Sequence, residues 1–97
     1  AYSPLGDAYL VVWEDSRGAD TDIYGQFVLG NGALLGGEIP IHDGAGNQNQ
    51  PSVAYSDATE SFLVVWSDER PEAVGTADLY GQSIGSVRRL FIPVALR

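Results

Sequence analysis

The sequence predicts an all-β protein, and three observations lead to this fold class. The chain of 97 residues contains an internal repeat with a period of 53 residues. The segments shared by the two copies are rich in β-branched and aromatic residues, and glycine-containing turn sequences such as Asn31-Gly32 separate them. No segment has the apolar spacing of an amphipathic helix.

The repeat emerges when the chain is shifted against itself. The run YLVVW at residues 9–13 matches FLVVW at 62–66, and residues 1–3 match 54–56. After a three-residue insertion in the second copy, DIYGQ at 22–26 matches DLYGQ at 78–82, and a compensating deletion then brings IPI at 39–41 onto IPV at 92–94. Both length changes fall between apolar segments, as is typical of loops. The chain is therefore one unit of two repeats, residues 1–53 and 54–97.

Four short strands are expected in each repeat, with hairpin turns between them. The first is expected over residues 50–55, and most of its counterpart in repeat 1 lies before the first residue of this sequence. The others are expected over 9–15 and 62–68, over 22–29 and 78–84, and over 38–41 and 91–96.

Residue types predict where each strand lies in its sheet. Both alternating sets of the second strand are apolar, so we expect it to be buried on both faces of a sheet that is covered on each side. Pro40 and Pro93 place the fourth strand at an edge, since proline lacks the donor that a central strand needs. Small residues such as Ser52 and Ala54 suit a crowded first strand near an axis. The predicted order is first to fourth, from inside to outside.

Sheets of four strands, about 50 residues each and covered on both faces, are the blades of a β-propeller. Two blades do not close a ring, which usually takes about four to eight. We therefore expect completion by a longer parent chain or by self-association, with three chains giving six blades. The alternative fold is a seven-stranded β-sandwich.

The motifs of the repeat also resemble those of a known family. The pattern W-x-D-x-R at residues 13–17 and 66–70, followed by D-[IL]-Y-G-Q and preceded in repeat 2 by PSVAYS, resembles the WD-like blades of TolB-type propellers and of related repeats in large secreted bacterial proteins. The resemblance covers nearly the whole chain, although the Pro-Asp-Gly turn common in TolB-type blades is absent. It implies an extracellular or cell-surface location, and it specifies a blade rather than an activity.

The repeated polar and aromatic residues are assigned to the framework of the blades. Because Asp15, Arg17 and Asp22 recur as a set in repeat 2, a structural Asp-Arg-Asp network is favoured over a pair of catalytic carboxylates, which an active site needs only once. The assigned framework residues are Trp13, Asp15, Arg17, Asp22, Tyr24, Gln26, Trp66, Asp68, Arg70, Asp78, Tyr80 and Gln82.

A ligand-binding surface is expected where the loop after the second strand meets the connection between repeats, because both emerge at the same rim of a blade. Its polar groups suit a sugar or a cation, and they are also typical of tight turns. The candidate ligand-binding residues are Arg17, Asp20, Asp43, Asn47, Gln48 and Asn49.

The amino-acid composition limits which partners, metals and cofactors we expect. A net charge of -8, with five arginines and no lysine, disfavours nucleic acid and anionic membranes as partners. With one histidine, His42, and no cysteine, we expect no catalytic triad, no metal centre and no cofactor. Calcium held by Asp15, Asp20 and Asp22 is an alternative, although the spacing of an EF-hand loop is lacking.

The sequence therefore predicts a non-catalytic β-propeller repeat module that binds carbohydrate or protein. Two alternatives stay open: a two-blade part of a larger propeller enzyme of the glycoside hydrolase type, and a purely structural scaffold.

Overall fold

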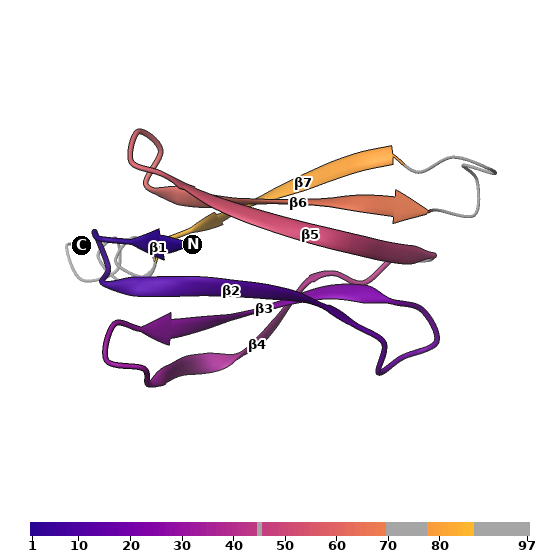
Figure 1. Ribbon diagram of the computed structural model, residues 1–97, viewed down its shortest axis with the longest axis horizontal. Coiled ribbons are helices and arrows are strands. Elements are labelled where there is room, and N and C mark those ends of the chain that lie inside the picture. The colour runs from indigo at the N-terminus through magenta and orange to yellow at the C-terminus, as the bar shows by residue number, and fades with distance from the viewer. Residues whose placement is uncertain (45, 70–77, 87–97) are drawn as a thin grey trace, which may run out of the picture.

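A computed structural model describes residues 1–44, 46–69 and 78–86, and these residues form seven strands (Figure 1). No helix occurs in these described ranges, so the predicted all-β class is confirmed. The strands are Tyr2–Ser3 (β1), Ala8–Asp15 (β2), Asp22–Leu29 (β3), Leu34–His42 (β4), Asn47–Ser56 (β5), Ser61–Glu69 (β6) and Asp78–Gly85 (β7).

Each repeat builds a sheet of its own from consecutive strands. The first sheet has the order β1-β2-β3-β4 and the second has the order β5-β6-β7, and all pairs are antiparallel. This is the strand order predicted from sequence. The pairing register is also repeated, because Trp13 lies opposite Tyr24 in the first sheet as Trp66 lies opposite Tyr80 in the second.

Two strands begin several residues earlier than the sequence predicted. β4 begins at Leu34 instead of Glu38, and β5 begins at Asn47 instead of Gln50. β5 continues through a register shift between Asn49 and Ser52, where Gln50 adopts a left-handed φ of 55°. This bulge admits Pro51, which has no N–H for a regular ladder. The predicted strand 91–96, with Pro93, lies outside the described residues.

The sequence Asn31-Gly32 forms the predicted hairpin turn between β3 and β4. The Leu29 N–H donates to the Ala33 carbonyl, and the Gly32 N–H donates to the Leu29 carbonyl, each at 2.8 Å. Gly32 has a φ of 91°, whereas Asn31 is not in the left-handed region. The turn is therefore not type I′, which needs positive φ at both central residues.

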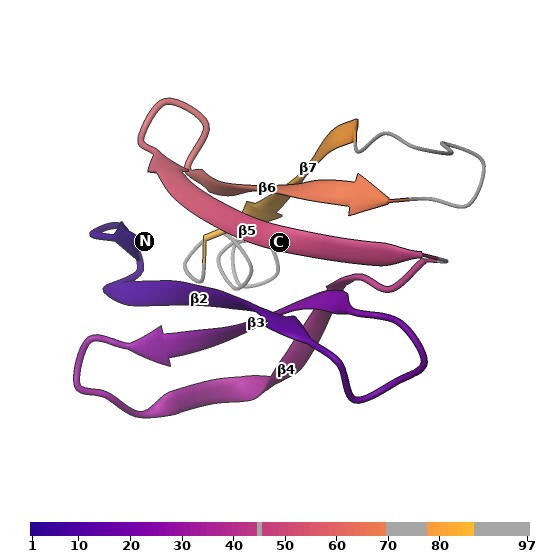
Figure 2. The same ribbon diagram turned by 45° about the vertical axis from the view of Figure 1, so that its right-hand side comes forward.

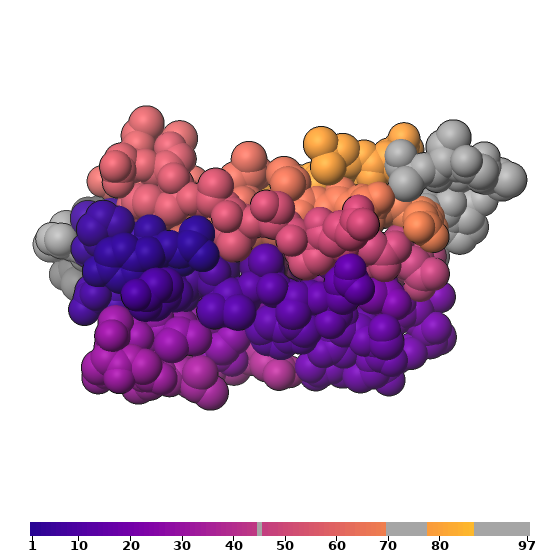
Figure 3. Space-filling model, viewed as in Figure 1, coloured from indigo at the N-terminus to yellow at the C-terminus, as the bar shows by residue number. Residues whose placement is uncertain are grey.

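The two sheets pack through one face each, and β5 lies against β2 and β3 (Figure 2). Figure 3 shows the two repeats in close contact along the length of the molecule. Phe27 and Phe62 meet across this interface with ring centroids 6.0 Å apart. The buried apolar residues between the sheets are Ala8, Leu10, Ile23, Phe27, Phe62, Val64 and Trp66.

Burial of the second strand on both faces is wrong for this chain taken by itself. In β2, Leu10 is buried but Tyr9 and Val11 are 45% and 46% exposed. In β6, Phe62 and Val64 are buried but Leu63 is 52% exposed. Each sheet is thus covered on one face in the described structure, and the two sheets do not close on themselves.

Edge placement of the fourth strand is confirmed for the first repeat. β4 pairs with β3 alone among the described strands, and Pro40 lies opposite Tyr24 on that strand.

At the centre of the sheet, Gly25 is where a side chain would be tightest, since an added Cβ would lie 2.8 Å from Ile41 Cδ1. This close approach explains a glycine in the middle of β3.

Candidate functional site

The candidate site is the polar rim, which we define as residues 16–22, 42–44 and 46–50. The loop from β2 to β3 and the connection from β4 to β5 emerge at the same end of the molecule, as the sequence predicted (Figure 1). They touch, because the Gln48 N–H donates to the Thr21 carbonyl at 2.8 Å.

Three of the six predicted ligand-binding residues form hydrogen bonds with the main chain of the rim. The Thr21 N–H donates to Asn47 Oδ1 at 2.9 Å, and the Gly46 N–H donates to Asp20 Oδ2 at 3.1 Å. Gln48 is fully buried, and its Nε2 donates to the Gly46 carbonyl at 3.0 Å. These groups hold the connection between repeats against the first sheet, which is the turn role considered for them from sequence.

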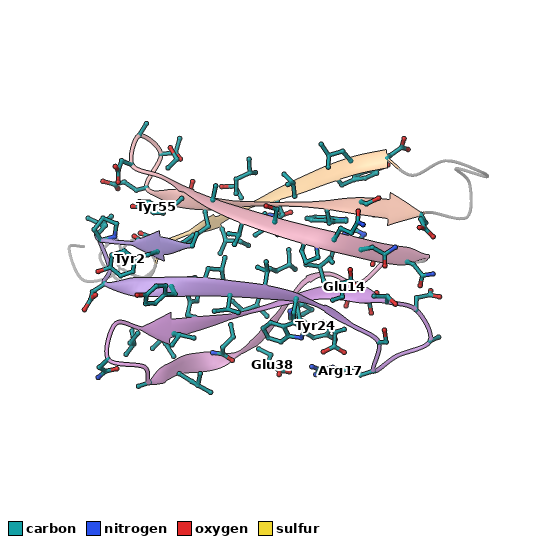
Figure 4. The ribbon with its side chains drawn as sticks, in the orientation of Figure 1. Tyr2, Glu14, Arg17, Tyr24, Glu38 and Tyr55 are labelled. Atoms are coloured by element: carbon teal, nitrogen blue, oxygen red, sulfur yellow. The ribbon has the colours of Figure 1, made fainter. Side chains whose placement is uncertain are left out.

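The other predicted rim residues lie apart from this cluster. Asn49 Nδ2 donates to Glu69 Oε2 at 3.3 Å, within the second sheet. Arg17 lies on the face of the first sheet that points away from the second sheet, beside Glu38 and Tyr24 (Figure 4). Asp43 is exposed at the rim itself. Of the six residues, Asp20, Asn47 and Gln48 are therefore brought together, and Asn47 and the neighbouring Asp43 are exposed to solvent.

The Trp-x-Asp motif makes the same hydrogen bond in both repeats. Trp13 Nε1 donates to Asp15 Oδ2 at 3.1 Å, and Trp66 Nε1 donates to Asp68 Oδ2 at 3.2 Å. The indole and the carboxylate lie two residues apart on one face of a strand, so the strand period brings them together. This supports the framework role that the repeat suggested for these residues.

Arg17 forms an acidic network, but its members differ from those predicted. Its Nε donates to Asp15 Oδ1 at 2.7 Å, and its Nη1 lies 2.8 Å from Glu38 Oε1. Its guanidinium carbon also lies 4.3 Å from the centre of the Tyr24 ring. Glu38 of β4 thus takes the place expected for Asp22. Arg70, the counterpart of Arg17, lies outside the described residues.

Gln26 ties β4 to β3. Its Nε2 donates to the Leu35 carbonyl at 2.9 Å and to the Gly36 carbonyl at 3.2 Å, next to the register shift between these strands. Its counterpart Gln82 donates to the Ser83 carbonyl at 3.3 Å. A framework role for both glutamines fits these contacts.

His42 is the rim residue that sequence reasoning missed. It ends β4, and its ring stacks on Trp66 with centroids 5.3 Å apart. Its Nε2 lies 3.8 Å from Oδ2 of the buried Asp68. The sequence placed His42 in a turn, and no local pattern linked it to a motif 24 residues further along.

The pKa values of Asp22, in the rim, and of Asp15, next to it, are shifted in opposite directions. Burial, followed by the nearby carboxylates of Asp43 and Asp20, raises the pKa of Asp22. The hydrogen bond from Arg17 holds the pKa of Asp15 far below its usual range. Asp22 Oδ1 is buried without a hydrogen-bond partner among the described residues. The rim is therefore a locally negative surface that favours cationic or hydroxyl-bearing groups.

Metal binding at these carboxylates is not supported by their arrangement. Within the described ranges, no group of three His, Asp or Glu side chains is arranged so that it could hold a metal ion. The same ranges hold no helix that could cross a membrane.

No protein-family model matches this chain. Searches of curated proteins and of solved structures also gave no significant match. The functional argument therefore rests on the residues of the chain and their geometry.

Proposed function

We propose that this chain is a non-catalytic repeat module of a β-propeller, with two blades that further blades complete, and that its rim binds carbohydrate or protein. The observation that carries the proposal is the duplicated framework. Both repeats use the Trp-x-Asp hydrogen bond and the same strand register. The side chains that could take part in acid-base chemistry therefore have a structural role in each blade. A catalytic pair would not be needed twice.

The topology favours a propeller over a sandwich. Each sheet is built from consecutive strands that run up and down, and no described strand crosses from one sheet to the other. Sandwiches of the immunoglobulin type exchange strands between sheets through Greek-key connections. Completion comes from a longer chain or from copies of this one.

The rim is the proposed binding surface because polar groups of the first sheet and of the connection between the repeats meet there. The exposed Asp43 lies beside Asp22 and Asp20, which concentrates negative charge there. A basic protein segment or the hydroxyl groups of a sugar would suit such a surface.

A glycan array and a pull-down with the assembled protein test this function. We expect a specific ligand, whose binding to Asp43→Ala is at least about 10-fold weaker, the scale of one lost charged contact. The control is Asp57→Ala, an exposed carboxylate in the turn from β5 to β6. Absence of any ligand, or equal loss in both variants, would contradict rim binding.

A structural scaffold is the second candidate, and one observation favours it. Asp20 and Asn47 accept hydrogen bonds from the main chain and Gln48 is buried, so these groups already have partners. A fully assembled ring that binds nothing at the rim would fit this candidate.

A further inference from the structure

Each sheet has two apolar faces of different character. The aromatic face carries Tyr9, Val11 and Trp13 in the first sheet, and Phe62, Val64 and Trp66 at the matching positions of the second. The leucine face carries Leu10 and Val12 in the first sheet, and Leu63 and Val65 in the second. Successive residues of a strand point to opposite faces, so the repeat fixes which residues share a face.

Within the chain, the two repeats meet through non-equivalent faces. Leu10, from the leucine face of the first sheet, is fully buried, and so are Phe62 and Val64 from the aromatic face of the second. The interface is therefore head to tail. Among the described residues, this pattern leaves the aromatic face of the first sheet and the leucine face of the second uncovered.

All the exposed large apolar side chains of the described residues lie on these two uncovered faces. Strand register assigns each of them, because Tyr2 and Val28 lie opposite Tyr9, Leu34 lies opposite Val28, and Leu79 lies opposite Ser67. The aromatic face of the first sheet exposes Tyr2, Tyr9, Val11 and Leu34, and the leucine face of the second exposes Leu63 and Leu79.

The uncovered aromatic face already has the geometry of the covered one. Tyr2 and Tyr9 pack with ring centroids 4.9 Å apart and an interplanar angle of 52°. At the matching positions of the second sheet, Tyr55 and Phe62 pack at 5.1 Å and 59°, and Phe62 there is fully buried. The first sheet thus exposes to solvent an aromatic pair equivalent to the one that the second sheet packs against its neighbour.

We infer that a second copy of this chain docks the leucine face of its second sheet onto the aromatic face of the first sheet, repeating the internal interface between molecules. The inference rests on the proposed blade function and deepens it by naming the partner and the faces. Such a heterologous contact propagates until it closes into a ring.

Side-chain size supports this pairing at a position where the repeats differ. Inside the chain, Phe27 meets Phe62. In the proposed contact, Ser83 of the docked copy stands where Phe27 does, and Tyr9 of the receiving copy stands where Phe62 does. The smaller serine leaves room for the tyrosine, and the two hydroxyl groups can pair when buried.

A mixing experiment tests the head-to-tail contact. Val11→Glu blocks the aromatic face, Leu63→Glu blocks the leucine face, and Ala58→Glu in the exposed turn from β5 to β6 is the charge-matched control. Circular dichroism first establishes that all three fold. Analytical ultracentrifugation then measures the mass of each variant alone and of an equimolar mixture of the first two.

Wild type and Ala58→Glu should associate, whereas each face variant alone should associate at least about 100-fold more weakly, because it buries an unpaired charge. The mixture should form a 1:1 dimer of twice the 10.3 kDa chain mass and stop there. The inference is overturned if the mixture forms no dimer. It is also overturned if Leu63→Glu alone associates, since its unchanged aromatic faces would then be binding each other. These masses do not depend on rim binding, so failure here and failure of the rim ligand are distinguishable.

Discussion

The first and the second sheet pair their strands in the same register but bury opposite faces. Leu10 is fully buried and its counterpart Leu63 is 52% exposed, while Phe62 is fully buried and its counterpart Tyr9 is 45% exposed. Local sequence is therefore enough to set the pairing within a sheet. Burial depends instead on which neighbour the sheet has, because a strand with two apolar faces is suited to be covered on either one.

The same contrast appears in the Trp-x-Asp motif. Both indoles donate to the aspartate two residues later. On the outer face, Asp15 then pairs with the exposed Arg17, whereas in the interface Asp68 lies near His42 of the other sheet. One motif thus serves a solvent-facing ion pair in one repeat and a contact between sheets in the other.

The largest expected effect comes from matched leucine substitutions. Leu10→Ala should lower the free energy of unfolding by about 2–5 kcal/mol, because it leaves a cavity between the sheets. Leu63→Ala should cost less than about 1 kcal/mol when the chain is dilute enough to be monomeric, since its side chain is half exposed. Urea denaturation followed by tryptophan fluorescence measures both. Equal losses would show that the two sheets are buried alike.

A smaller difference is expected for the two glycines of the Tyr-Gly-Gln motif. An added Cβ at Gly25 would lie 2.8 Å from Ile41 Cδ1, whereas at Gly81 its closest neighbour would be Val65 Cγ1 at 3.3 Å. Ile41 Cδ1 ends a flexible side chain that can move aside, so Gly25→Ala should cost only about 1 kcal/mol through overpacking, and Gly81→Ala less. Thermal denaturation of both variants checks the order, and a larger loss for Gly81→Ala would contradict it.

The strands of the two sheets could be predicted from the sequence, whereas several contacts between them could not. The repeat located all seven described strands and their order, because insertions fell in loops and the apolar runs did not change length. It did not reveal the left-handed Gln50 that extends β5, or the partner of Arg17, since Glu38 comes from a strand 21 residues away. His42 was missed for the same reason: its contacts with Trp66 and Asp68 depend on how the sheets pack.

The smallest expected effect concerns two carboxylates that lie opposite each other in the register, Asp15 and Asp22. Because the pKa of Asp22 is raised, its charged form disfavours folding at neutral pH, and this penalty disappears as the pH falls through its folded pKa. Asp22→Asn should therefore be more stable than wild type at pH 7 by roughly 0.5 kcal/mol. The advantage should fade as the pH falls towards about 4, near the ordinary pKa of aspartate.

Asp15→Asn should behave in the opposite sense. The pKa of Asp15 is lowered in the folded state, so its contribution to stability is present above about pH 4 and is lost as the pH falls towards the folded value. The variant should be less stable than wild type at pH 7, and this deficit should shrink in acid. Urea denaturation from pH 7 to pH 2 measures both, with Asp78→Asn, the exposed counterpart of Asp22, as the control. Destabilisation by Asp22→Asn at pH 7 would contradict the assignment.

Two equivalent sheets stack head to tail, and we propose that another copy of the chain covers the face of each kind that they leave exposed. Static light scattering of the wild-type chain over a range of concentrations tests it most directly. We predict a stable species of several chains, with three chains giving six blades. A constant mass of 10.3 kDa up to the solubility limit would contradict the account.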